Sequence, residues 1–316
     1  KVGAALCGRP SGGARRGAPL LEELDQLRPD VLHGFHAYAS GGIVTEAAER
    51  FKAASVITAT GTDINHDLFD PERRHAVLGA LQKASAIVVF HEIMRGKILA
   101  EIPEADRKIR TIKQTVRCHE KPYDFRGRLG FQKGDFVFFV PAGVRKVKNV
   151  TYCLKPLAQL HPLCPQIRVV FVGPILEEGE GERLLRAIEG LPWAFYLGPV
   201  SHEELCAMLL SVDVVLNTSL SEGGMANAIL EAMSRGVAVL ASDIEGNRSV
   251  VQDGIDGLLF ASEEEFLKKA EALIQDEGLR KRLGEAAKRK IEQEFPWEGE
   301  IQDYLALYQE LLNRGS

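Results

Sequence analysis

The chain has 316 residues, a formal net charge of -5 at pH 7, and hydrophobic residues at 45% of its positions. A protein that mainly binds a nucleic-acid backbone is usually strongly basic, so this charge argues against that class, and any phosphate site must be local. No apolar run approaches the roughly 18 residues that cross a membrane, so we expect a soluble protein without an integral membrane segment. The length predicts two α/β domains of roughly 100 to 200 residues each.

The chain begins at Lys1, and residues 1–6 are predicted to form a short strand that opens in the middle of a domain. We therefore expect the N-terminal domain to lack its first strand. Any signal peptide would lie in the absent part, so the sequence leaves its presence open. The five cysteines are odd in number and widely spaced, without a C-x-x-C pair of the zinc or redox type. They favour a reduced compartment, and we expect a cytoplasmic location.

Short apolar runs then alternate with helical stretches along the chain. Several runs are continuous in Val, Ile, Leu or Phe, as in parallel strands that helices cover on both faces. The pattern predicts an α/β protein with two Rossmann-like, doubly wound domains. The predicted strands cover residues 31–35, 55–60, 86–90, 136–140, 168–172, 194–197, 212–216 and 237–241.

A Gly-rich and charged stretch, residues 126–135, precedes the strongest strand, and we place the domain boundary and the hinge near it. The N-terminal domain then covers residues 1–130 and the C-terminal domain residues 131–296. Residues 263–276 and 279–295 are predicted helices, and Pro296 ends the second of them. The last predicted helix, within residues 297–316, is expected to pack back toward the N-terminal domain.

The segment from Asn217 to Gly236 concentrates the chemistry, because it combines a strand end, a glycine loop and a helix. Ligands of open parallel sheets bind beyond the carboxyl ends of the strands. The pair Gly223 and Gly224 lets backbone N–H groups approach an anion, and the following helix N-terminus attracts a diphosphate. Glu222 and Glu231 flank this loop, where a carboxylate can accept two hydrogen bonds from a sugar diol. The alternative is a capping residue and a solvated helix residue.

This segment resembles the signature of the retaining GT-B glycosyltransferases of the group 1, or family 4, type. The N-terminal stretches at residues 36–42 and 60–65 are similar to those of the glycosyltransferase 1 domain-containing protein branch. The resemblance extends over nearly the whole chain. The other matching segments are residues 143–148, 172–174, 197–200, 203–205 and 295–297.

The resemblance implies a role for each motif residue. Glu231 would hold the ribose hydroxyls, Glu222 would face the donor sugar, and Arg145 and Lys148 would bind the donor diphosphate. Cationic side chains there can stabilise the departing diphosphate without a metal. The remaining donor-binding candidates are Gly143, Gly173, Gly198, Val200, Ser221, Gly223, Gly224, Met225, Ala226 and Asn227.

Two spacings depart from the family pattern. Eight residues separate Glu222 from Glu231 where the family has seven, so either the loop bulges or Gly223 takes the place of the first carboxylate. Two residues separate Arg145 from Lys148 where many members have four, which indicates a compact variant.

The N-terminal, acceptor-side domain offers further candidates. The resemblance implies that His36 contacts the donor sugar, and His33 is its rival three residues earlier. Asp63 could equally cap a helix or bind the acceptor, and Tyr38 is a second acceptor candidate.

These features together predict a retaining transferase that moves a hexosyl or N-acetylhexosaminyl group from a nucleotide sugar to an unidentified acceptor. The family favours UDP as the nucleotide. No D-x-D pair lies at a strand end, so we expect no metal and no cofactor. The resemblance implies that the leaving diphosphate itself helps to deprotonate the acceptor. The alternatives are a non-catalytic sugar-nucleotide-binding protein and a relative that makes seleno- or thio-sugars. A dehydrogenase is disfavoured because no G-x-G-x-x-G motif with a following acidic residue occurs between a strand and a helix.

Overall fold

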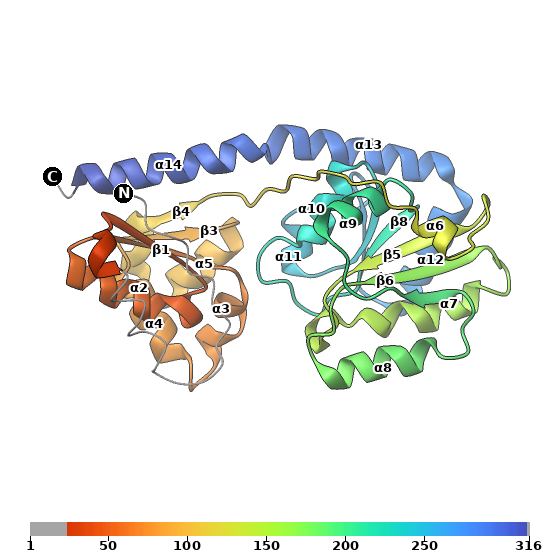
Figure 1. Cartoon of the computed structure of the whole chain (residues 1–316), viewed down its shortest axis with the longest axis horizontal. Helices are drawn as coiled ribbons and strands as arrows, with labels where there is room; N and C mark the ends of the chain where they lie inside the picture. The colour runs from red at the N-terminus through yellow and green to blue at the C-terminus, as the bar shows by residue number, and fades with distance from the viewer. Residues whose placement is uncertain (1–23, 315–316) are drawn as a thin grey trace. The chain divides into compact units, whose positions relative to one another are not determined.

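The computed structural model describes residues 24–314, which form two compact units (Figure 1). Unit 1 comprises the described residues up to Gln114 and those from Glu298 onward, and unit 2 runs from Thr115 to Trp297. The strand predicted at residues 1–6 lies outside the described residues. No helix between residues 24 and 314 is both long enough and apolar enough to cross a membrane.

Unit 1 is a parallel sheet with the strand order β1-β2-β3-β4 and helices in the connections. The helix that follows β1 begins after His36, and its buried face presents small residues to the sheet. The strands are β1 (Val31–Phe35), β2 (Ala54–Thr58), β3 (Ala86–Val89) and β4 (Ile109–Thr111). The helices are α2 (Ala37–Phe51), α3 (Thr62–Asn65), η1 (Asp67–Phe69), α4 (Arg74–Lys83), α5 (Glu92–Glu101), η2 (Pro103–Lys108) and α14 (Trp297–Arg314).

Helix α14 is held to the sheet of unit 1 by an apolar stripe and by hydrogen bonds. Leu307 and Leu311 are buried against a cluster that contains Val56 and Val88. Tyr308 Oη lies 2.6 Å from Nδ1 of His33, whose Nε2 lies 2.7 Å from Oγ1 of Thr58. His33 is 6% exposed, so its ring links α14 to β1 and β2 from inside the unit.

Unit 2 is a six-stranded parallel sheet with the order β10-β9-β8-β5-β6-β7. Its strands are β5 (Phe136–Pro141), β6 (Ile167–Val172), β7 (Ala194–Tyr196), β8 (Val214–Asn217), β9 (Ala238–Ser242) and β10 (Leu258–Phe260). Its helices are α6 (Phe125–Arg128), η3 (Lys146–Lys148), η4 (Val150–Cys153), α7 (Leu154–Leu160), α8 (Glu178–Ile188), α9 (His202–Leu209), α10 (Asn227–Ser234), α11 (Glu245–Arg248), α12 (Glu263–Gln275) and α13 (Glu277–Glu294).

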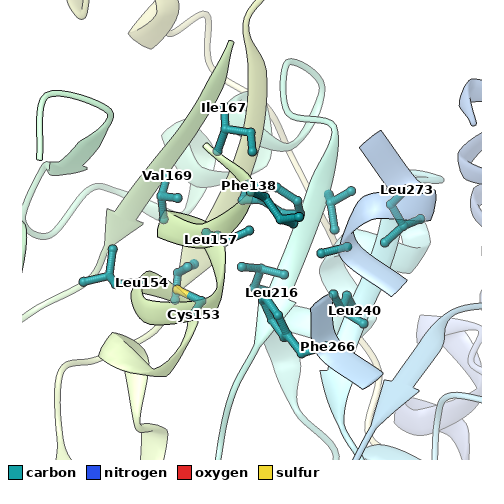
Figure 2. Packing of buried hydrophobic residues seen from close by; sticks show 14 of the residues in the cluster. Phe138, Cys153, Leu154, Leu157, Ile167, Val169, Leu216, Leu240, Phe266 and Leu273 are labelled. Carbon is teal, nitrogen blue, oxygen red and sulfur yellow. The ribbon is translucent and has the colours of Figure 1, made fainter. Parts of the chain in front are cut away.

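The core of unit 2 explains why its strands read as continuous apolar runs. All six residues of β5 are buried, because helices cover both faces of the sheet. On one face Phe138 and Leu216 pack with Leu157 of α7 and Phe266 of α12 (Figure 2). Burying each such side chain stabilises the fold by about 1.5 to 3 kcal/mol, so this layer holds the strand ends in fixed positions.

The predicted fold class is confirmed, since both units are parallel α/β sheets. Each of the eight predicted strands that lie within the described residues is present, with bounds that differ by up to two residues. Strands β4 and β10 were not predicted. The stretch at residues 126–135, where we placed the hinge, is held to unit 2 by Arg126, which donates to Ser211 O and Asp213 Oδ2.

Burial lowers the pKa of His33 from 6.5 to about 4, which predicts acid sensitivity of unit 1. The unfolded chain binds the proton more readily than the folded chain, so stability is complete above pH 6.5 and is lost as the pH falls toward 4. At pH 4.5 the loss should be about 2 to 3 kcal/mol. Hydrogen exchange of the backbone amides of β1 and α14, compared at pH 7 and pH 4.5, measures this loss of stability. The variant His33→Asn should show a smaller loss over this interval, whereas the control His75→Gln, on an exposed position, should match the unchanged chain.

Candidate functional site

The strand order of unit 2 defines where a ligand can bind. From β5 the chain runs outward through β6 and β7, and it then returns to pair β8 with the other side of β5. The connections leaving β5 therefore diverge at this point, and such a switch point opens a crevice beyond the carboxyl ends of the strands. The loop after β5 carries Arg145 and Lys148, and the loop after β8 carries Glu222.

Glu222 and Lys148 form a buried ion pair that joins these two loops. The Glu222 side chain is 9% exposed, and its Oε1 accepts hydrogen bonds from Lys148 Nζ at 2.5 Å, Ser219 Oγ at 2.6 Å and Asn217 Nδ2 at 3.1 Å. Thr218 Oγ1 also donates to the carbonyl of Asn149. Glu222 and Lys148, for which the resemblance implied separate roles, therefore belong to one hydrogen-bonded group.

The loop with the additional residue rests on helix α11. A Cβ atom on Gly246 would lie 2.5 Å from Cβ and 2.6 Å from O of Glu222, and 2.9 Å from O of Gly224. Only glycine permits this approach. The turn that contains Gly223 thus packs on α11, while the Glu222 carboxylate is directed toward Lys148. Beyond it, Ser221 is half-buried, Met225 and Ala226 are buried, and Asn227 begins α10.

Arg145 lies at the switch point, half-buried, with one nitrogen of its guanidinium fully buried. Its Nε atom is buried and has no hydrogen-bond partner among residues 24–314. The adjoining turn η3 is fixed because the backbone N–H of Lys146 donates to Glu177 Oε2. A buried unsatisfied donor on a guanidinium is uncommon in folded proteins, and an anionic ligand is the partner it matches best.

Glu231 is a second buried carboxylate, placed on α10. Its Oε1 lies 3.0 Å from Nε2 of His202, and Glu231 is 8% exposed. Burial raises the pKa of Glu231, and the contact with His202 opposes that rise. His202 is the first residue of α9, whose start is fixed by the capping box between Ser201 and Glu204. We did not predict His202, although the Ser-His-Glu-Glu sequence after a strand marks such a helix start.

An apolar pocket of about 190 Å³ lies beyond the carboxyl ends of β5, β6 and β7. A Cβ atom on Gly173, where φ is 142°, would lie 2.3 Å from the carbonyl oxygen of Ala142, so the two strand ends touch. Gly198, with φ of 72°, turns the chain beside it. The pocket brings together three predicted donor-binding residues, Gly143, Gly173 and Val200. It is lined by Pro141, Ala142, Gly143, Val172, Gly173, Pro174, Pro199, Val200 and Leu205.

In unit 1, His36 lies at the carboxyl end of β1 and adopts an unusual backbone. Its φ of 76° is rare outside glycine, and such outliers concentrate at functional positions. Nδ1 accepts a hydrogen bond from the backbone N–H of Ala39, and Nε2 lies 3.7 Å from Oδ2 of Asp67. Asp67 also accepts from Arg73, whose guanidinium lies over the ring of Tyr38. Asp67 and Arg73 were not predicted.

Asp63 accepts hydrogen bonds from backbone N–H groups of unit 1. Its carboxylate is fully buried and accepts hydrogen bonds from the N–H groups of Ala37 at 2.7 Å, Gly61 at 2.7 Å and Thr60 at 3.1 Å. It thereby links the start of α2 to the loop before α3. Of the two interpretations of Asp63, these contacts favour the capping one. His33 likewise lies inside the unit, under α14.

A disulfide joins Cys118 and Cys206, whose Cα atoms are 5.5 Å apart although 88 positions separate them in the sequence. Cys206 Sγ lies 3.8 Å from Nε2 of His202, next to Glu231. This bridge differs from the reduced state that the cysteine spacing favoured. The sequence held no local signal for it, because only the fold brings the two cysteines together.

Two parallel α/β units, of which the second carries cationic and carboxylate groups at its switch point, define the GT-B class of glycosyltransferases. Residues 124–290, more than half of the chain, match the family model "Glycosyl transferases group 1". The chain belongs to this family.

Known proteins show the same likeness. The chain is 28% identical over 263 residues to "Glycosyltransferase 1 domain-containing protein 1" of Xenopus tropicalis, covering 81% of this chain and 76% of that protein. Anabaena HepE, solved in complex with UDP-glucose, superposes with a TM-score of 0.82 at 18% identity, over 93% of this chain and 82% of HepE. Sucrose-phosphate synthase from Thermosynechococcus elongatus gives 0.80 at 17% identity, over 94% of this chain and 77% of the synthase. At these identities the two structures support the fold alone.

The Glu222 and Lys148 pair predicts a specific pattern of stabilities. The variant Lys148→Met leaves Glu222 buried without its cation and should lower the free energy of unfolding by about 2 to 3 kcal/mol. The double variant K148M/E222Q should recover most of this loss, because a neutral amide can still accept from Ser219. Chemical denaturation measures both. The control Lys155→Met, at a surface pair with Glu263, should cost under about 1 kcal/mol. The single variant E222Q completes the cycle, and a loss in the double variant equal to the sum of the two single losses would show that the pair is not coupled.

Proposed function

We propose that this protein transfers a sugar from a nucleotide-sugar donor, a UDP-sugar, to an acceptor with retention of the anomeric configuration. The observation that carries the proposal is the convergence, at one switch point, of an apolar pocket, a buried carboxylate and an arginine Nε without a protein partner. A base, a ribose diol and a diphosphate require these three chemistries in turn. HepE, whose structure contains UDP-glucose, supports the choice of nucleotide.

The base, the ribose and the diphosphate of the donor would each contact different residues beyond the carboxyl ends of the strands. The flat base enters the pocket lined by Gly143, Gly173 and Val200, and the ribose hydroxyls donate to Glu231. Arg145 supplies the fork of N–H groups that matches phosphate oxygens, and the N-terminus of α10 adds its partial positive charge. Lys148 is oriented toward the same charge by Glu222, which stands beside the donor sugar.

The chemistry follows from where charge develops. As the bond to the diphosphate breaks, negative charge grows on its oxygens, and preorganised cations stabilise that charge by a few kcal/mol per contact. The departing oxygen can then accept the acceptor proton, so neither a protein nucleophile nor a protein base is required. We propose that Arg145 and Lys148 supply this stabilisation without a metal, and that His36 contacts the donor sugar.

The ribose role of Glu231 is tested by comparing UDP with 2′-deoxy-UDP. The unchanged chain should bind UDP roughly tenfold more tightly, because the lost hydroxyl leaves the carboxylate short of a hydrogen bond. In Glu231→Gln both affinities should fall and the preference should shrink toward unity. Isothermal titration calorimetry measures the four constants. The control Glu285→Gln, an exposed carboxylate of unit 2, should keep the preference. A preference that survives in Glu231→Gln would refute the role.

The diphosphate role of Arg145 predicts a graded series. Arg145→Lys keeps the charge and loses the fork, so UDP affinity should fall modestly, whereas Arg145→Ala should cost about 1.5 to 3 kcal/mol, or roughly 10- to 100-fold. Uridine, which has no phosphate, should bind all three proteins alike. If Arg145→Ala weakens uridine as much as UDP, the residue does not bind the diphosphate.

Turnover separates an enzyme from a sugar-nucleotide-binding protein. Release of UDP from UDP-sugars should be measurable with a panel of acceptors that includes thiols, and it should be unchanged by EDTA. Loss of activity with EDTA would contradict metal-independent transfer. Tight UDP binding without hydrolysis or transfer would favour the non-catalytic alternative.

A further inference from the structure

The disulfide of unit 2 is part of a cluster with metal-ligand chemistry. The Sγ atoms of Cys118 and Cys206 and a ring nitrogen of His202 all lie within 4.8 Å of one another. They come from two segments, because Cys118 precedes α6 and the other two residues lie one turn apart on α9. Two thiolates and an imidazole are the ligands that Zn²⁺ prefers.

A fourth oxygen ligand is already in place beside the imidazole. Oε1 of Glu231 lies 3.0 Å from His202 Nε2, which in turn lies 3.8 Å from Cys206 Sγ. In a tetrahedral zinc site, bond lengths of about 2.0 to 2.3 Å put neighbouring ligand atoms roughly 3.3 to 3.8 Å apart. Small side-chain shifts would therefore bring these donors to the required separations.

The surroundings favour entry of an ion and retention of its ligands. His202 is exposed and Cys118 is half-buried, so the cluster opens to solvent on one side, whereas Cys206 and Glu231 are buried. The backbone around Cys118 is fixed, since its carbonyl accepts from Arg235 and the N–H of Lys121 donates to the carbonyl of Glu203 on α9.

We propose that the reduced protein binds a thiophilic divalent cation, Zn²⁺ in the first place, through Cys118, Cys206, His202 and Glu231. A dithiol first reduces the cystine, so that the S–S bond breaks, two thiols form and the dithiol is oxidised to its own disulfide. The cation then displaces one proton from each thiol. The imidazole binds as the neutral ring, and the metal replaces the contact between His202 and Glu231.

The site has a consequence for the donor. A metal-bound Glu231 has one oxygen and most of its charge committed to the cation, so it would accept the ribose hydroxyls more weakly, and the cation and the nucleotide should compete. This consequence rests on the proposed function, whereas metal binding itself does not. The cation would inhibit donor binding. This effect is compatible with the proposal that the transfer step itself needs no metal.

Cobalt is the probe for the site, because thiolate-bound Co²⁺ absorbs through charge transfer and a tetrahedral ion has intense d–d bands. The full chain, reduced with a phosphine and freed of metal, is titrated with Co²⁺ and then with Zn²⁺. We expect stoichiometric thiolate absorption that Zn²⁺ removes, and no such absorption in the oxidised chain. Cys118→Ser, Cys206→Ser and His202→Gln should each weaken Co²⁺ binding at least about tenfold.

Matched controls come from the other cysteines and from an exposed histidine. Cys164→Ser, His75→Gln and Cys7→Ser, the last outside the described residues, should keep the absorption. Absence of the absorption in the reduced chain, or its persistence in Cys118→Ser or Cys206→Ser, would overturn the site. Circular dichroism of each variant verifies that it is folded.

The competition is tested separately. Zn²⁺ should weaken UDP binding to the reduced chain and leave UDP binding to the oxidised chain unchanged. If cobalt binds but UDP affinity does not respond, Glu231 is not the fourth ligand or does not hold the ribose. The UDP affinities of Glu231→Gln and of the unchanged chain, both measured without metal, then decide between these two explanations. If Glu231 does not hold the ribose, the variant binds UDP as tightly as the unchanged chain.

Discussion

Two carboxylates are buried beyond the carboxyl ends of the strands of unit 2, and each has to be compensated by a donor from another segment of the chain. Removing a carboxylate from water costs several kcal/mol unless hydrogen bonds and an opposite charge replace the solvent. For Glu222 the compensation comes from Lys148, which joins the loops after β5 and β8. For Glu231 it comes from His202, which draws the start of α9 against α10. These two contacts therefore help to fix the segments after β5, β7 and β8, in addition to the apolar core.

The same requirement explains the residue types at the switch point. If the loops at the switch point only had to pack against one another, apolar side chains would be sufficient and would avoid the desolvation cost. Instead these loops hold polar groups under partial burial, with an arginine Nε that the described part of the chain leaves without a partner. Buried polar groups of this kind discriminate between ligands because an incorrect ligand leaves them unpaired. This arrangement is the observation on which the proposed donor site rests.

The sequence predicted the elements that are long, buried and local. Strands such as β5 and β6 were found because parallel strands buried on both faces are continuous apolar runs. Strands β4 and β10 were missed, and each has only three residues at a sheet edge. Strand β7 is equally short and also lies at an edge, yet it was predicted, so length alone does not explain the miss. The resemblance supplied roles for residues such as Arg145 and Glu231, but these roles stay predictions.

The sequence could not give the contacts between residues that are distant along the chain. His202 and Glu231 are 29 positions apart, and Lys148 and Glu222 are 74 apart, so no spacing rule relates them. The additional residue between Glu222 and Glu231 left two conformations open, and the close approach of Gly246 is what shows that the turn packs on α11. The choice for Asp63 was open for the same reason, since a cap and a ligand contact require the same residue type and differ only in which N–H groups are near.

Contacts around Glu231 connect it to the disulfide and to the segment that enters unit 2. Its partner His202 shares α9 with Cys206, and Cys206 is bonded to Cys118 in the segment that leads from Gln114 into unit 2. Arg235, one turn beyond Glu231 in the chain, donates to the carbonyl of Cys118 and to Glu120. The incoming segment is therefore attached on both sides of the buried carboxylate, to α9 and to the end of α10. A change in the bonding of the two sulfur atoms cannot be confined to the surface, because the atoms next to them are those that fix the orientation of Glu231.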